Sequence, residues 1–317
     1  MSSAGKALVT GGGGFIGSHL VERLLRDGYE VRVLDNFATG HRANLAAFGS
    51  DVELVEGDIQ SYERVHNAVR GCELVFHIAA LPSVPRSIQD PLTSTASNVT
   101  GTLNVLLAAR DEDVRRVVFS SSSSVYGPQE EFPQREAVAA RPISPYGVSK
   151  LAAEGYCRAF TQVYGLETVA LRYFNVFGPR QDPLSQYAAV IPKFITAALA
   201  GERPVIFGDG EQSRDFTYID NTVDGTVLAG SAEGVAGETF NVACGEATTL
   251  NQLVDHVGEL TGNPVDAVHA ERQPGDLSRS LADISRAREA LGYEPAVDLR
   301  SGLEKTFAHL SGDARPT

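Results

Sequence analysis

Cysteines, basic residues and long apolar runs are all scarce in this sequence. Its three cysteines, Cys72, Cys157 and Cys244, are odd in number and lack metal-like spacing, so we expect buried thiols and no metal site. Lysine and arginine total 27 against 40 acidic residues, and the net charge of −13 argues against nucleic-acid binding. No stretch approaches the roughly 18 apolar residues of a membrane span. The N-terminus lacks signal-peptide features, which favours a cytoplasmic location.

What is present is an ordinary globular composition, with 43% hydrophobic and 21% charged residues in 317. Apolar runs alternate with helical patterns through the first half, which is typical of a doubly wound parallel sheet. Strands are predicted at Lys6–Thr10, Glu30–Leu34, Val52–Glu56, Leu74–His77 and Arg116–Ser120, and helices at Phe15–Arg26, Tyr62–Val69 and Asn98–Arg110. The residue His77 closes one of these strands, so we expect it to be packed in the core.

The pattern changes after about residue 175, where glycine- and proline-containing loops separate shorter elements. We therefore expect a smaller mixed α/β domain that closes over the first. A regular apolar stretch at about 216–241 is predicted to return to the large sheet. The predicted division is 1–175 plus about 216–241 for the first domain, and 176–215 plus 242–317 for the second.

A glycine-rich loop, Thr10–Gly17, lies between the first predicted strand and helix. Gly11 permits a tight turn, Gly14 lets a pyrophosphate approach the backbone, and Gly17 allows close helix packing. The helix N-terminus then offers free N–H groups to phosphate. This is the pattern of a Rossmann-type dinucleotide site, although a glycine-rich loop alone is also compatible with an ordinary turn.

Acidic residues after the next two strands support the dinucleotide site. Asp35 ends the second strand, where a carboxylate can bind the adenosine ribose and repel a 2′-phosphate, which favours NAD over NADP. Arg42 is the nearby residue that favours NADP, because an arginine can bind the 2′-phosphate. Asp58 is predicted either to reach the adenine or to cap the helix near Ser61.

Tyr146 and Lys150 are spaced i and i+4 in the segment Ser144–Lys150, so a helix places both on one face. A lysine and a nicotinamide cation nearby would lower the phenol pKa and make the tyrosine a general base. An ordinary exposed helical turn is the alternative. Five serines, Ser120–Ser124, follow a predicted core strand and place hydroxyl groups at its carboxyl end.

These residues together resemble the extended short-chain dehydrogenase/reductase family, in particular its UDP-sugar 4-epimerases. The resemblance spans essentially the whole chain. It rests on the glycine loop, Asp35, Asp58, His77–Ala80, Asn98, the serine segment, Tyr146 with Lys150, Arg172–Arg180, Ser213–Phe216 and Gly275-Asp276.

The resemblance implies residue roles and a cofactor. Tyr146 would be the base, Lys150 would hold the nicotinamide ribose, and Ser122 would relay the proton. It implies NAD contacts from Gly11, Gly14, Phe15, Ile16, Gly17, Asp35, Asn36, Asp58, Ile59, Ala79, Ala80, Asn98, Tyr146, Lys150 and Tyr173. It implies UDP-sugar contacts from Ser83, Ser122, Ser123, Asn175, Val190, Arg214, Arg272, Asp276 and Ser280. A homodimer that pairs the helices near 92–110 and 146–164 is also expected.

Neighbouring positions narrow the expected reaction. Dehydratases and decarboxylases of this family carry carboxylates just after the relay hydroxyl, whereas this chain has Ser123 and Ser124, which favours the epimerase. Ser280 replaces a bulky tyrosine of the glucose-restricted enzymes and leaves room for an N-acetyl group. Asp182 stands where glucuronate epimerases carry an arginine, which disfavours an acidic sugar.

The expected activity is therefore inversion of C4 in UDP-GlcNAc or UDP-GalNAc, with UDP-Glc and UDP-Gal as further substrates. The segments Leu81–Ser87 and Arg180–Pro192 are similar to bacterial UDP-N-acetylglucosamine 4-epimerases. Alternatives are a UDP-glucuronate 4-epimerase, a sugar-nucleotide dehydratase or reductase, and a non-catalytic NAD-binding protein. Arg272 lies one position earlier than the family's usual phosphate-binding arginine, so Arg279 is the alternative ligand.

Overall fold

A computed structural model describes residues 4–183, 189–262, 264–272 and 277–312. Within these ranges, no helix is both long enough and apolar enough to cross a membrane. The described residues also contain no cluster of three or more His, Cys, Asp or Glu side chains arranged to hold a metal ion.

The centre of the fold is a seven-stranded sheet in the order β11-β6-β5-β4-β1-β2-β3. Every neighbouring pair of these strands is parallel. The strands are β1 (Lys6–Thr10), β2 (Glu30–Asp35), β3 (Val52–Glu56), β4 (Leu74–His77), β5 (Arg116–Ser122), β6 (Glu167–Tyr173) and β11 (Thr239–Val242). The predicted parallel sheet is confirmed, and the last strand of the 216–241 stretch joins it beside β6 as expected.

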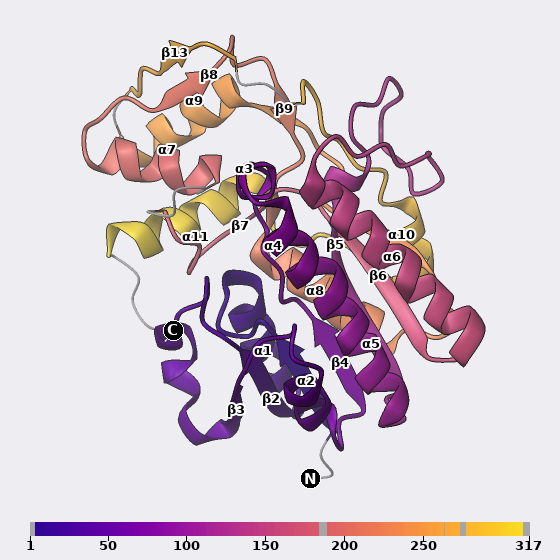
Figure 1. The fold of residues 1–317 in the computed structure, drawn as a ribbon. Helices are drawn as coiled ribbons and strands as arrows, with labels where there is room; N and C mark the ends of the chain where they lie inside the picture. Colours follow the sequence, from indigo (N-terminus) through magenta and orange to yellow (C-terminus); the bar gives the residue numbers. More distant parts are fainter. Residues whose placement is uncertain (1–3, 184–188, 263, 273–276, 313–317) are drawn as a thin grey trace.

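Helices cover both faces of this sheet (Figure 1). One apolar cluster joins the sheet to α1 (Phe15–Arg26) and α8 (Ile219–Ser231). A second cluster joins its other face to α2 (Tyr62–Val69), α5 (Gly101–Asp111) and α6 (Pro145–Tyr164). The apolar residues of the inner strands are thus buried on both sides, as parallel sheets require, whereas Leu54 of the edge strand β3 is exposed.

The later elements form a smaller layer beyond the carboxyl ends of the strands (Figure 1). It contains three short strand pairs, β7 with β10, β9 with β12, and β8 with β13. These strands are Val176–Phe177, Thr217–Tyr218, Ser213–Arg214, Thr248–Thr249, Val205–Phe207 and Val268–Ala270 respectively. The helices of this layer are α7 (Val190–Leu199), α9 (Leu250–Thr261) and α11 (Leu299–Ser311). Helix α10 (Ser285–Leu291) instead packs against β11 and α8 beside the large sheet.

Short helices complete the first half of the chain and refine one predicted boundary. They are η1 (Arg42–Asp51), α3 (Val84–Gln89), α4 (Pro91–Thr95), η2 (Ala96–Thr100) and η3 (Ser123–Val125). The predicted helix Asn98–Arg110 is in fact the π-helical turn η2 followed by α5. π-Helical turns often occur at functional sites, where they re-aim a side chain.

The cysteines and His77 are placed largely as predicted. Cys72 and Cys157 are buried free thiols, whereas Cys244 is only partly buried, so the expectation of burial is wrong in degree for that residue. His77 is fully buried, and its ring nitrogens contact the hydroxyl groups of Thr10 at 2.7 Å and Thr102 at 2.9 Å.

Candidate active site

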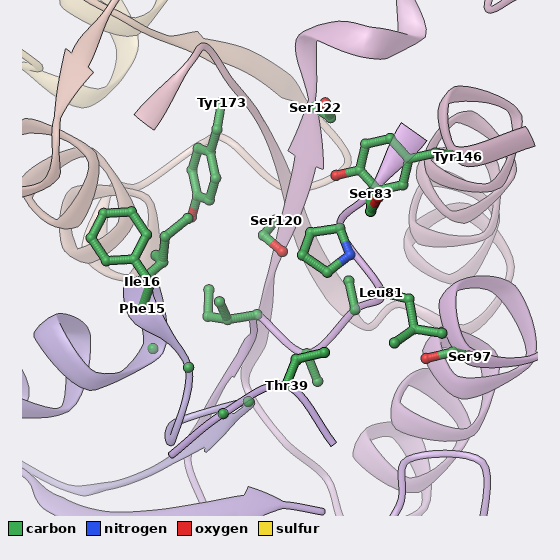
Figure 2. A pocket seen from close by; sticks show the side chains of 18 of the residues that line it. Phe15, Ile16, Thr39, Leu81, Ser83, Ser97, Ser120, Ser122, Tyr146 and Tyr173 are labelled. Atoms are coloured by element: carbon green, nitrogen blue, oxygen red, sulfur yellow. The ribbon is translucent and has the colours of Figure 1, made fainter. Parts of the chain in front are cut away.

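A cavity of about 560 Å³ lies at the carboxyl ends of the sheet strands, where open α/β sheets bind ligands. The glycine loop and α1 form one side of it, and the start of α6 and the loop after β4 form the other (Figure 2). The structure thus brings the glycine loop and the Tyr146/Lys150 pair, which are far apart in the sequence, to a single cavity.

The glycine loop has the geometry of a phosphate cradle. Gly11 adopts a left-handed conformation with φ of 73°, and a Cβ atom on Gly17 would lie 2.1 Å from the Gly11 carbonyl oxygen. Helix α1 follows Gly14 without any side-chain cap, so its first N–H groups are available at the cavity. A Cβ on Gly14 would meet only the Gly11 carbonyl oxygen and would otherwise project into open space.

Asp35 is held at the end of β2 by two backbone N–H groups. Gly13 donates to its Oδ2 at 2.8 Å and Phe37 donates to its Oδ1 at 2.7 Å. The carboxylate is therefore fixed beside the glycine loop and lines the cavity. Arg42 lies over the Phe37 ring, 4.3 Å from its centroid, and forms an ion pair with Glu56. Arg42, the residue that favoured NADP in the sequence, is therefore already paired with a carboxylate.

Asp58 also lines the cavity, and the alternative that it caps α2 is wrong. Ser61 is the N-cap residue of that helix. Asp58 instead accepts hydrogen bonds from Asn36 Nδ2 and from the Gln60 N–H, both at 2.8 Å. The carboxylate thereby connects the ends of β2 and β3 at the edge of the cavity.

Helix α6 positions the tyrosine and the lysine. Ser144 caps the helix by accepting from the Gly147 N–H at 3.1 Å, and Pro145 occupies the first helical position. Tyr146 is 9% exposed and Lys150 is 2% exposed, so the pair is not an exposed helical turn. Tyr146 directs its hydroxyl group into the cavity (Figure 2). Lys150 Nζ donates to the Ser120 carbonyl oxygen at 2.8 Å.

The pKa values of this pair differ from the sequence expectation. Burial raises the pKa of Tyr146 to about 12, and a hydrogen bond with Ser122 opposes that rise. Burial also lowers the pKa of Lys150 to about 7. The expected lowering of the tyrosine pKa is therefore not found in the protein alone, because desolvation outweighs the hydrogen bond with Ser122.

Serine hydroxyl groups surround the Tyr146 side of the cavity. The lining includes all of Ser120–Ser124, together with Ser83 from the loop after β4. Ser122 ends β5, and its Oγ accepts from the Ser124 N–H at 3.1 Å. The strand end therefore presents Ser122 on the same cavity wall as Tyr146.

Asn98 lies behind this wall and not in the lining. From the π-helical turn it binds both backbone groups of Leu81, accepting from N–H at 2.8 Å and donating to the carbonyl oxygen at 3.3 Å. It also donates to Ser149 Oγ at 3.1 Å, and Ser149 donates to the Tyr146 carbonyl oxygen. Asn98 thus ties the loop after β4 to the start of α6.

The structure brings most of the other predicted residues to the cavity. Asn175 lines it with an unusual φ of 35° and donates to the Asp215 carbonyl oxygen at 3.1 Å. The remaining predicted residues in the lining are Phe15, Ile16, Asn36, Ile59, Ala79, Ala80, Tyr173 and Ser123.

Four predicted substrate-binding residues are described by the structure and are not in the lining. Val190 begins α7, and Ser280 is buried with its N–H donating to the Ser213 carbonyl oxygen. Arg214 donates to that same Ser213 carbonyl oxygen. Arg272 donates to Ser278 Oγ at 2.7 Å. Asp276 falls outside the described residues.

Six lining residues belong to no motif of the sequence analysis, namely Leu34, Ala38, Thr39, Gly40, Gly57 and Ser97. The rest of the lining comes from segments named there without a role for each residue, and these are Ile78, Leu81, Pro82, Val84, Arg86, Ser120, Ser121, Ser124, Val176, Gln181, Asp182 and Ala189. Gly40 is a glycine for a structural reason, because a Cβ atom there would lie 2.8 Å from the Gly13 carbonyl carbon of the glycine loop.

The donor set at this cavity fits NAD. The uncapped helix start suits a pyrophosphate, the carboxylate of Asp35 suits a ribose diol, and Lys150 lies deeper beside Tyr146. The arginine that argued for a 2′-phosphate is paired with Glu56.

Known proteins match the chain over nearly its full length. The UDP-glucose 4-epimerase of Mycolicibacterium smegmatis is 41% identical over 305 residues, which cover 95% of this chain and 97% of that protein. The solved UDP-N-acetylglucosamine 4-epimerase of Methanobrevibacter ruminantium is 38% identical with a TM-score of 0.94, covering 99% and 100%. The UDP-glucuronic acid 4-epimerase of Bacillus cereus, solved with its substrate and NAD, is 32% identical with a TM-score of 0.90, covering 98% and 100%.

The profile of the NAD dependent epimerase/dehydratase family matches residues 7–243 of this chain. That range contains the glycine loop, Asp35, Ser122, Tyr146 and Lys150. The protein therefore belongs to the NAD-dependent epimerase/dehydratase family of the extended short-chain dehydrogenases/reductases, among the UDP-sugar 4-epimerases and their relatives.

Proposed function

We propose that this protein inverts C4 of a neutral UDP-hexose, with UDP-GlcNAc and UDP-GalNAc as preferred substrates and UDP-Glc and UDP-Gal as further ones. The observation that carries the proposal is the convergence of Ser122, Tyr146 and Lys150 with the glycine loop at one cavity. Both reacting partners, a dinucleotide and a sugar hydroxyl, can then meet at the same place.

Tyr146 is the base in this proposal, and Lys150 tunes it. A protonated Lys150 beside the phenol favours the phenolate, which takes the proton of the C4 hydroxyl group, and Ser122 relays that proton. When bound, NAD supplies a hydride acceptor for C4 that later serves as the donor. The sugar is left as a 4-ketone and rotates between the two hydride transfers, so that it presents its opposite face to the second one. Tyr146 then returns its proton to the new hydroxyl group, so no net redox change occurs.

The carboxylates of the cavity favour epimerisation over elimination or decarboxylation. Among the described lining residues they are Asp35, Asp58 and Asp182, and none of them comes from the serine segment. The first two are held at the ends of β2 and β3 by the hydrogen bonds described above. A second acid or base next to Tyr146, which those other reactions need, is not among the described lining residues.

The preference for neutral sugars rests on two positions. Ser280 is buried outside the described lining, and the resemblance implies that a tyrosine at this position restricts the sugar. The Methanobrevibacter relative is named for UDP-N-acetylglucosamine. Asp182 adds a negative charge to the lining, which disfavours a carboxylated sugar.

An acidic UDP-sugar is the second candidate, because Arg86 also lines the cavity on the side of Ser83 and Val84. A guanidinium group binds carboxylates well through paired hydrogen bonds. The Bacillus cereus relative acts on UDP-glucuronic acid. A direct comparison of neutral and acidic UDP-sugars as substrates therefore decides whether the charge of Asp182 or that of Arg86 governs the choice of sugar.

We further propose a homodimer formed through α4 and α6. Large apolar side chains are exposed on α4, where Leu92 is 82% exposed, and recur along α6 at Val148, Tyr156 and Val163, which are 53%, 39% and 70% exposed. Their spacing of eight and seven residues puts the three on one side of α6, which favours that side as an association surface. Sedimentation velocity tests the proposal, and a monomer at micromolar concentration contradicts it.

The experiment on function offers UDP-Glc, UDP-Gal, UDP-GlcNAc, UDP-GalNAc and UDP-GlcA separately, with no added cofactor or with NAD alone. Chromatography of the products ranks the five sugars. We expect interconversion of the N-acetyl pair to be fastest. Conversion of UDP-GlcA alone supports the second candidate, and recovery of all five unchanged supports a non-catalytic NAD-binding protein.

A further inference from the structure

A buried ion pair lies directly beneath the Tyr146/Lys150 pair. Glu154 follows Lys150 by one helical turn on α6, and its side chain is fully buried. Arg172 on β6 donates to both carboxylate oxygens, from Nε at 2.9 Å and from Nη2 at 2.8 Å. Ser121 Oγ on β5 donates a third hydrogen bond to Glu154 Oε1. The carboxylate is thus held by two adjacent strands.

These contacts join the three elements that build the sugar side of the cavity. Ser121 and Arg172 face each other in the β5/β6 register, and the next pair along is Ser122 with Tyr173, both in the cavity lining. In the residue that precedes Ser121 on β5, the Ser120 carbonyl oxygen accepts a hydrogen bond from Lys150 Nζ. A shift of Glu154 therefore displaces the strand ends that carry these groups.

We propose that Glu154, held by Arg172 and Ser121, is a positioning residue that fixes Lys150 and Ser122 relative to each other; this rests on the proposed function. A buried ion pair is weak evidence for stability alone, because apolar residues of similar volume often stabilise as well. What the pair adds is a fixed geometry, because two parallel hydrogen bonds hold the Arg172 guanidinium group and the Glu154 carboxylate in one relative orientation. Arg172 is itself held over the Tyr126 ring, 4.6 Å from its centroid.

Glu154 also acts on Lys150 through charge. Burial lowers the pKa of Lys150 to about 7, and the Glu154 carboxylate opposes that shift. The other titratable groups facing the ammonium are Tyr146, with its ring centroid at 5.9 Å, Cys157 and His77. Glu154 therefore helps to keep Lys150 charged in the range where Tyr146 must act.

The test compares Glu154→Gln with Glu167→Gln. Glu167 pairs with Arg116 at the other end of the same two strands, far from the cavity, so it controls for the loss of an arginine–carboxylate contact between them. Glu167 is 39% exposed and Glu154 is fully buried, so thermal unfolding measures the larger structural cost of Glu154→Gln separately. A double variant, Glu154→Gln with Arg172→Met, avoids an unpaired buried charge if the single variant fails to fold. For each protein we would measure thermal unfolding, the dissociation constant for NAD, and the pH profile of kcat with the UDP-sugar that the wild type converts fastest.

We expect Glu154→Gln to lower kcat roughly tenfold to a hundredfold with KM little changed, because misplacement of about 1 Å costs that much. The alkaline limb of its profile should move to lower pH as the Lys150 pKa falls. NAD should bind more weakly than to Glu167→Gln. The proposal would be overturned if the two variants had equal kcat values, equal alkaline pKa values in their pH profiles of kcat, and equal dissociation constants for NAD. If the wild type converts no sugar, the proposed function fails, and the NAD affinities still decide the positioning role.

Discussion

Lys150 Nζ lies 2.8 Å from the Ser120 carbonyl oxygen, which puts an ammonium group on the backbone of the strand that carries Ser122. Burial lowers the pKa of this lysine to about 7, so near neutral pH part of the population is uncharged. The folded state therefore binds fewer protons than the unfolded chain between pH 7 and 10.5. The contribution of Lys150 to stability is largest above pH 10.5 and is lost as the pH falls toward 7.

We expect Lys150→Met to raise the thermal unfolding midpoint at pH 7 by a few degrees while it abolishes most of the activity. Methionine fills a similar volume without a buried charge. Calorimetry of the wild type and the variant checks the stability, and a sugar assay checks the activity. A lower midpoint in the variant would mean that the contact with Ser120 outweighs the cost of burying the ammonium.

Tyr146→Phe removes the phenol oxygen and little else. Since a positioned acid or base contributes about 10²–10⁴-fold, kcat should fall by that factor. The dissociation constant for NAD should stay within about threefold of the wild-type value, and this binding measurement is the control for folding. Full activity of Tyr146→Phe would falsify the assignment of Tyr146 as the base.

Asp35→Asn should weaken NAD binding roughly tenfold to a hundredfold, because the carboxylate accepts from the Gly13 and Phe37 N–H groups and faces the cavity. The same change should reduce the preference for NAD over NADP. Fluorescence titration with both dinucleotides measures this. Asp51→Asn, at an exposed residue of η1, is the matched control, and an equal effect of both changes would contradict a role for Asp35 in binding.

Acid should destabilise the protein through His77, which is fully buried, and His19, which is partly buried. Burial lowers the pKa of His77 to about 3 and that of His19 to about 4, so both are neutral in the folded state. Between those values and 6.5 the unfolded chain binds more protons, and stability falls as the pH drops below 6.5. Asp215 acts in the opposite direction, since burial raises its pKa to about 6.

His77→Asn isolates one of these contributions. Below about pH 6 it should reduce the slope of the unfolding free energy with pH by about 1.4 kcal/mol per pH unit, which is one proton. Urea titrations at pH 4.5, 5.0, 5.5 and 6.0 give the slope. An unchanged slope would show that His77 is not neutral in the folded protein.

Local sequence patterns determined most of the first half of the fold. Helices Phe15–Arg26 and Tyr62–Val69 have the predicted bounds, because apolar periodicity and a local N-cap or glycine turn define them. The shared face of Tyr146 and Lys150 follows from helical spacing alone. The ends of β2 and β5 run one and two residues beyond their predicted limits, because pairing with neighbouring strands extends them.

Only the tertiary structure decided which predicted residues meet and what charge they carry. Desolvation depends on every element packed around a group, and in the protein alone it raises the pKa of Tyr146, whereas the sequence led us to expect a lowering beside Lys150 and a nicotinamide cation. Asn98 was predicted from a motif at the cofactor, yet the π-helical turn directs it to Leu81 and Ser149. The contact of Glu154 with Arg172 joins a helix to a strand, and no local pattern encodes such a contact. The sequence determined the chemistry available, and packing decided where each group lies.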